Sequence, residues 1–96
     1  MYNIKEELSL EARLEMIAEE ASELSQAALK LSRYLRGENP VCRSKEELEK
    51  NLAEEISDVF LAIAATEYRP DWNIIAMKKE RWQERMKKRK KDGDQK

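Results

Sequence analysis

A long helical pattern at residues 9–37, which read SLEARLEMIAEEASELSQAALKLSRYLRG, decides the fold of this chain. Its apolar residues recur three or four positions apart, which is the period of one face of an α-helix. They are Leu10, Leu14, Ile17, Ala21, Leu24, Ala28, Leu31 and Leu35. Ser9 is a favourable N-cap, and Gly37 is a typical C-terminal stop. The stretch therefore predicts an amphipathic helix over residues 10–36.

Two further helices are predicted downstream. Residues 44–47 have the Ser-x-x-Glu form of a capping box, which opens a helix over residues 45–67 that ends before Pro70. Its apolar positions are Leu48, Leu52, Ile56, Val59 and Ile63. Asp71 is a favourable cap for a third helix over residues 71–88.

The composition agrees with an all-α protein. Charged and apolar residues each make up 41% of the chain, and there are only two glycines and two prolines, which is typical of long helices with few turns. Ninety-six residues suit a single domain. We therefore expect one domain over residues 1–96, an antiparallel bundle of three main helices, with a disordered basic tail at residues 87–96.

The second helix indicates a partner. Residues 59–65, which read VFLAIAA, are apolar nearly all round the helix. Such a segment is typical of a helix that is enclosed on several sides, and a single hairpin cannot enclose it. We therefore expect the bundle to be completed by oligomerisation, as a homo-dimer or a homo-tetramer.

Several classes of chemistry are excluded by composition. The chain has no histidine, which removes Ser-His and Cys-His nucleophile pairs and the usual zinc-hydrolase ligand sets. Its single cysteine, Cys42, cannot form an intramolecular disulfide. No run approaches the roughly 20 apolar residues of a membrane span, and the acidic N-terminus has no apolar signal core. We expect a cytoplasmic protein that is not in a membrane and whose metal ligands, if any, are oxygens.

Two acidic pairs, Glu20/Glu23 and Glu55/Asp58, stand out from the other carboxylates. The members of each pair are three residues apart, so they share one face of a helix. At 100° per residue, both pairs are offset to the same side of their apolar stripes, and an antiparallel hairpin brings them together. Four such carboxylates repel one another unless a cation lies between them, because no lysine shares their sectors. The pattern predicts a magnesium site, and the alternative is solvated surface charge.

These residues also carry a family resemblance. Glu19-Glu20-x-x-Glu23-Leu24 followed by Glu54-Glu55-x-x-Asp58-Val59 resembles the EExxE…ExxD signature of the MazG-like all-α nucleoside triphosphate pyrophosphohydrolases, the superfamily that also contains the dimeric dUTPases. The match covers the first two helices, roughly residues 10–67, and Lys78-x-x-Arg81 in the third helix adds a weaker echo.

The resemblance implies a function and a set of site residues. It implies Mg²⁺-dependent hydrolysis of an NTP or dNTP to the nucleoside monophosphate and pyrophosphate, with Mn²⁺ as a substitute metal. By position, the metal ligands are Glu20, Glu23, Glu55 and Asp58. Glu19 or Glu54 is the candidate catalytic residue, either as a further acid beside the metal ligands or as the base that activates water. Basic side chains of the third helix suit the triphosphate, and an aromatic side chain suits the base. These candidate substrate-binding residues are Lys78, Arg81, Arg85 and Trp72.

Two other functions compete with hydrolysis. The apolar stripe of the first helix is also typical of a non-catalytic interaction module that pairs with a partner helix. The basic C-terminal segment is a footprint typical of nucleic-acid binders, since residues 78–96 carry ten Lys/Arg against four Asp/Glu. The remaining residues 1–77 carry nine against sixteen, and this net charge of −7 repels a long polyanion. We therefore favour a nucleotide substrate over nucleic acid.

Overall fold

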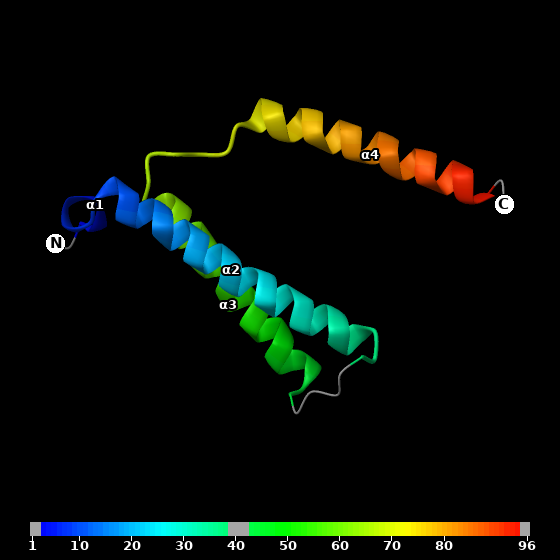
Figure 1. The fold of residues 1–96 in the computed structure, drawn as a ribbon, viewed down its shortest axis with the longest axis horizontal. Coiled ribbons are helices and arrows are strands. Elements are labelled where there is room, and N and C mark those ends of the chain that lie inside the picture. Colours follow the sequence, from blue (N-terminus) through cyan, green and yellow to red (C-terminus); the bar gives the residue numbers. More distant parts are fainter. Residues whose placement is uncertain (1–2, 39–42, 95–96) are drawn as a thin grey trace.

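Four helices make up the part of the chain that the computed structural model describes, residues 3–38 and 43–94. They are α1 (Ile4–Glu7), α2 (Leu10–Leu35), α3 (Lys45–Ala64) and α4 (Trp72–Asp94). No strand occurs among these residues. The predicted all-α fold class is therefore confirmed, and α2 and α3 form an antiparallel hairpin (Figure 1).

The helix starts follow from local side-chain caps. Ser9 Oγ accepts a hydrogen bond of 3.1 Å from the backbone N–H of Ala12, and Ser44 Oγ accepts one of 3.2 Å from that of Glu47. At the other end of α2, Gly37 has a φ of 72°, in the left-handed region that favours glycine. Each cap satisfies backbone groups that a helix end leaves without a partner.

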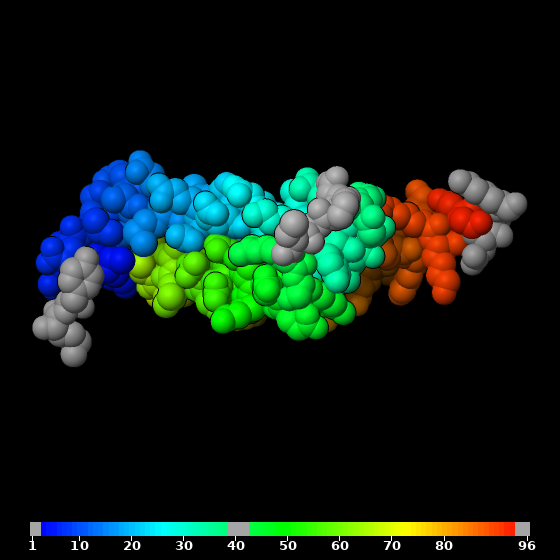
Figure 2. Space-filling view, turned by 90° about the horizontal axis from the view of Figure 1, so that it is seen from below, coloured from blue at the N-terminus to red at the C-terminus, as the bar shows by residue number. Residues whose placement is uncertain are grey.

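Small side chains fill the seam between α2 and α3. Ala27 of α2 and Ala62 of α3 are buried, and Leu48 near the start of α3 is only 1% exposed. The two helices lie against each other along the hairpin (Figure 2). The larger apolar residues Phe60 and Leu61 are 68% and 69% exposed. The hairpin therefore has a core of few buried side chains. Oligomerisation, predicted from the apolar residues 59–65, remains a prediction.

A buried arginine ties the open end of the hairpin together. Arg13 Nη1 donates to the carbonyl of Ala65 at 2.9 Å and to Glu67 Oε1 at 3.1 Å, while its Nε donates to the carbonyl of Leu8 at 3.3 Å. One guanidinium thus joins Leu8, two residues before α2 begins, to the end of α3 and to the segment after it. The predicted second helix ran to residue 67, whereas α3 ends at Ala64.

The segment that leads to α4 is also held by side chains. Thr66 is fully buried, and its hydroxyl donates to the carbonyl of Ile63 at 2.7 Å and accepts from the backbone N–H of Tyr68 at 3.2 Å. Arg69 Nη1 donates to the carbonyls of Thr66 and Tyr68 at 2.7 and 2.6 Å. These contacts fix the direction in which the chain leaves the hairpin.

The helix α4 stands away from the hairpin (Figure 1). Asp71 Oδ1 caps it by accepting from the backbone N–H groups of Asn73 and Ile74 at 3.0 and 3.1 Å. The radius of gyration is 18.3 Å, against about 12 Å for a compact chain of this length. The three predicted main helices are therefore present, but the third packs against neither of the other two within one chain.

The C-terminal part of α4 is longer than expected. The helix continues to Asp94 instead of ending at residue 88. Of the tail predicted to be disordered, residues 87–96, residues 87–94 are therefore helical, and residues 95–96 lie outside the described residues. Lysine and arginine are good helix formers, and Lys87 Nζ lies 3.6 Å from Glu84 Oε1 one turn earlier. Within the described ranges, none of the helices combines the length and the apolar character that crossing a membrane requires.

Candidate metal centre

Three of the predicted carboxylates meet between α2 and α3. One oxygen from each of Glu20, Glu55 and Asp58 lies within 4.8 Å of the other two. Glu20 comes from the middle of α2, and the other two come from one face of α3, three residues apart. The antiparallel hairpin therefore brings Glu20 of the first acidic pair to both members of the second pair, on the side that their shared offset predicts.

The fourth predicted ligand, Glu23, lies outside this group of three, although its negative charge affects the pKa of Glu55. The pKa of Glu55 is raised above 4.5, first because Glu55 is half-buried and then because of the negative charges of Asp58, Glu23, Glu20 and Glu54. Glu23 itself is exposed one turn further along α2. It is thus near enough to repel Glu55 but is not gathered with the other three.

No cationic side chain neutralises the three carboxylates in the described part of the chain. The ion pairs found there join Arg13 to Glu67, Arg43 to Glu47 and Lys87 to Glu84. Clustered acids without a basic partner destabilise the fold that holds them together. A bound cation would remove this repulsion.

The cluster borders an open hollow of about 500 Å³ at the end of the hairpin that holds α1. Glu20 and Asp58 supply its polar lining. The remaining lining residues are apolar, and several of them are small: Ile4, Met16, Leu61, Ala62, Ala64 and Ala65. The carboxylates therefore lie beside an apolar wall that is open to solvent. Ile4 comes from α1, and no periodicity in the sequence could have placed it at this site.

The donor set suits magnesium. Mg²⁺ prefers carboxylate oxygens and bonds of about 2.0–2.1 Å, so two oxygens bound to one ion are about 3–4 Å apart. The separation of up to 4.8 Å between the three carboxylates is slightly wider than that. Small side-chain movements would bring them within range, and the remaining coordination positions would be open to water and phosphate oxygens.

The other predicted site residues are not gathered at the cluster. Glu19 and Glu54 are exposed, each next to one of the three carboxylates in sequence. The predicted substrate-binding residues Lys78, Arg81, Arg85 and Trp72 all lie on α4 and are exposed. Since α4 packs against neither α2 nor α3, a single chain does not bring these groups to the carboxylates. Their proposed roles remain predictions.

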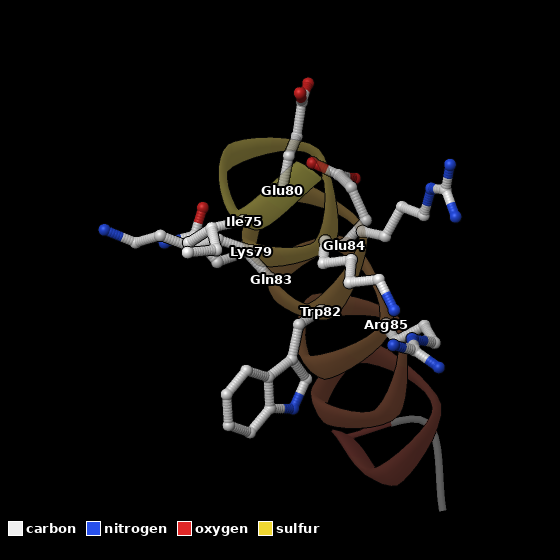
Figure 3. A pocket seen from close by; sticks show the side chains of 9 residues that line it. Ile75, Lys79, Glu80, Trp82, Gln83, Glu84 and Arg85 are labelled. Carbon is white, nitrogen blue, oxygen red and sulfur yellow. The ribbon is translucent and has the colours of Figure 1, made fainter. Parts of the chain in front are cut away.

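A second surface region surrounds α4 between Ile75 and Arg85 (Figure 3). Its nine lining residues belong to one helix, and their side chains point in different directions, with Trp82 on the side away from Glu80. One helix cannot enclose a cavity. The region is therefore an open helix surface that carries an aromatic side chain and several cations.

Comparison with family models, with curated proteins and with solved structures returned no match for this chain. The carboxylate cluster and the motif that contains it are what point to a function.

Proposed function

We propose that this chain is a MazG-like, magnesium-dependent hydrolase that converts an NTP or dNTP to the nucleoside monophosphate and pyrophosphate. The observation that carries the proposal is the meeting of Glu20, Glu55 and Asp58 between two helices, with no basic partner among the residues that the structure describes. The same residues stand in the EExxE…ExxD pattern of that superfamily.

In this proposal, Glu20, Glu55 and Asp58 hold the metal, and Glu23 joins them from the next turn of α2. When bound, Mg²⁺ supplies positive charge that offsets the charge of the phosphates, and it acidifies water at the site. Glu19 or Glu54, each adjacent to a ligand, accepts a proton from the attacking water. The water oxygen bonds to the α-phosphorus, and the bond from that phosphorus to the α,β-bridging oxygen breaks. Pyrophosphate is then the leaving group.

Cleavage at the α-phosphorus is favoured over cleavage between the β- and γ-phosphates. The chain has no Gly-rich loop of the P-loop type, since its two glycines are Gly37 and Gly93. The cations available to the departing phosphates are side chains, of which Arg81 and Arg85 can bind phosphate bidentately.

The product identity tests this mechanism. The protein is incubated with a panel of NTPs and dNTPs plus Mg²⁺ in ¹⁸O-labelled water, and the products are followed by phosphorus NMR. We expect a nucleoside monophosphate that carries the label, together with unlabelled pyrophosphate. A nucleoside diphosphate and orthophosphate as first products would refute the mechanism, even in a magnesium-dependent enzyme.

Matched variants test the site. Glu55→Gln and Asp58→Asn should abolish turnover and leave the helix content unchanged, because both side chains keep their shape. Glu49→Gln is the control, since Glu49 is an exposed carboxylate on the same helix but outside the cluster. Full activity in both site variants, or equal losses in the control, would contradict the assignment.

The non-catalytic interaction module remains the second candidate, and the unpartnered surface of α4 favours it. It differs from the hydrolase in one measurable respect. A pure interaction module turns over no nucleotide in the product assay, whatever its state of assembly.

A further inference from the structure

The helix α4 has an apolar stripe that no other described part of the chain covers. Trp72, Ile75, Lys79, Trp82 and Met86 recur at alternating spacings of three and four, the pattern of a helix that packs along another helix. All five are exposed. The aliphatic stem of Lys79 can lie on an apolar surface while its ammonium reaches solvent. Residues 72–86 therefore present a face suited to burial.

The charge of α4 is opposite to that of the hairpin. The helix carries nine Lys/Arg against four Asp/Glu, a net charge of +5. The sequences of α2 and α3 together carry eleven Asp/Glu against five Lys/Arg, a net charge of −6. Electrostatic complementarity of this kind steers association and fixes register.

The hairpin also presents the apolar surface that such a helix needs. The hollow beside the carboxylates combines Glu20 and Asp58 with the exposed Leu61 and the half-buried Met16. Phe60 is exposed next to it in sequence. A helix with an apolar stripe and basic flanks matches a surface that is apolar beside an acidic cluster.

The chain does not satisfy this match internally. Thr66 Oγ1 accepts a hydrogen bond from the backbone N–H of Tyr68, and Arg69 donates to the carbonyls of Thr66 and Tyr68. These bonds hold the segment after α3 in the conformation that directs α4 away from its own hairpin (Figure 1). The helix is about 34 Å long, against about 30 Å for α3, so it can span a hairpin of the same size.

We propose that α4 packs on the hairpin of a second copy of this chain, and that the second copy returns its own α4 in exchange. Each incoming α4 then covers the exposed apolar residues beside the hollow of the hairpin on which it packs, and each +5 helix lies on a −6 hairpin. A reciprocal exchange of this kind gives a closed dimer with two equivalent interfaces. An anionic membrane is the other surface that a basic helix with two tryptophans suits, but it repels the acidic hairpin that is attached to the helix.

The exchange has a consequence for the candidate site, and this part rests on the proposed function. In a single chain the carboxylates and the basic residues of α4 are apart. On the partner's hairpin, Lys78 and Arg85, which flank the apolar stripe, would lie beside the partner's Glu20 and Asp58. The metal ligands and the phosphate-binding cations would then come from different copies.

Two methionines provide a matched test of the interface. Met77 and Met86 are 54% and 53% exposed, and they are nine positions apart, so they point to opposite faces of α4. Sedimentation equilibrium of the full chain should give twice the mass of 11.3 kDa. Met86→Asp should raise the dimer dissociation constant on the order of 100-fold, because it buries a charge without a partner. Met77→Asp should leave the constant unchanged. A wild-type monomer, or equal effects of the two variants, would overturn the proposal.

Cross-linking between isotopically distinct chains shows which element is exchanged. Unlabelled and ¹⁵N-labelled protein are mixed, allowed to re-equilibrate and treated with a carbodiimide that joins lysine to carboxylate. Peptides that join Lys78 or Lys79 of one isotope to hairpin carboxylates of the other support the exchange. A dimer without such mixed peptides, or a monomer that binds phosphatidylserine vesicles through α4, refutes it. This result needs no nucleotide, so it stands apart from the proposed reaction.

Mixed-chain complementation then tests the shared site. If the protein is a hydrolase, an inactive Glu55→Gln chain mixed with an inactive Arg85→Glu chain should recover activity, because one of the two sites in a mixed dimer is intact. Recovery fails if the site lies within one chain. If wild-type protein has no activity, the proposed function is wrong, while the cross-linking result still decides the exchange.

Discussion

Replacing Arg13 should destabilise the hairpin more than replacing its acidic partner Glu67. In Arg13→Met the side chain keeps its length and most of its packing, but it loses the guanidinium that donates to the carbonyls of Ala65 and Leu8. The contact with Ala65 is buried. A buried carbonyl left without a donor costs about 1–3 kcal/mol. We therefore expect Arg13→Met to lower the free energy of unfolding by about 2–3 kcal/mol.

The ion pair with Glu67 should contribute much less. The Glu67 side chain is 57% exposed, so water screens the attraction between the two charges. Glu67→Gln keeps the shape and can still accept a hydrogen bond from Arg13. The backbone contacts of Arg13 should thus outweigh its salt bridge. Arg13→Lys should recover only part of the stability, because an ammonium cannot reproduce the planar fork that reaches Leu8 and Ala65 from one group.

Urea unfolding followed by circular dichroism measures these differences. The protein concentration is held constant for all variants, since any self-association would add to the apparent stability. If Arg13→Met falls within about 0.5 kcal/mol of wild type, the range of an ordinary surface substitution, the buried contacts do not hold the hairpin end. Equal losses for Arg13→Met and Glu67→Gln would instead assign the effect to the ion pair.

Four further predictions concern the core, the metal and the pH dependence that two carboxyl groups produce. Leu48→Ala should lower the free energy of unfolding by about 2–5 kcal/mol in the same urea experiment, because Leu48 is 1% exposed. A loss below about 1 kcal/mol would mean that the neighbouring residues close the cavity. Mg²⁺ should raise the melting temperature of the wild type but not of the double variant Glu55→Gln/Asp58→Asn, and equal shifts would place the binding elsewhere. The folded-state pKa of Glu55 is raised above 4.5, so the carboxyl group loses its proton less readily in the folded chain than in the unfolded chain. Without metal, the wild type should therefore lose stability relative to Glu55→Gln as the pH rises through the raised pKa. The pKa of Glu67 is lowered by the hydrogen bond that it accepts from Arg13. The stability that this carboxylate contributes should be present above pH 4.5 and disappear as the pH falls through the lowered pKa. A difference in unfolding free energy between wild type and Glu67→Gln that does not change with pH would contradict this.

The helices were predictable because their signals are local. Ser9, Ser44 and Asp71 cap the three long helices as expected, since a cap depends only on residues two or three positions away. The end of α3 was not predictable, because the sequence has no strong helix breaker before Pro70. What ends the helix is the set of contacts to Thr66 and to Arg13, which lies 52 residues away from Ala65 in sequence. Contacts between residues so far apart in sequence do not change the spacing of apolar residues from which a helix is predicted.

The candidate site was predictable to the extent that helix angles decide it. The shared offset of the acidic pairs correctly brings Glu20, Glu55 and Asp58 together. The angle of a residue on a helix does not say which turn of α2 faces which turn of α3, and Glu23 is left outside the group for this reason. The apolar periodicity of the sequence gives no information about where α4 lies relative to the hairpin. Its apolar stripe shows that it needs a partner surface but not which surface that is.

The Arg69 guanidinium, which donates to the carbonyls of Thr66 and Tyr68, affects how many chains an assembly of this protein would contain. Arginine keeps its charge over the whole accessible pH range, so these two hydrogen bonds help to hold the angle at which α4 leaves the hairpin throughout that range. With that angle constant, every copy offers its helix in the same direction. If the direction is compatible with a two-fold axis, exchange stops at a pair; if it is not, each added chain presents another free helix, and the same contact propagates into an open filament. The geometry of the seven-residue connection between α3 and α4, and not the strength of the interface, then sets the number of chains in the assembly.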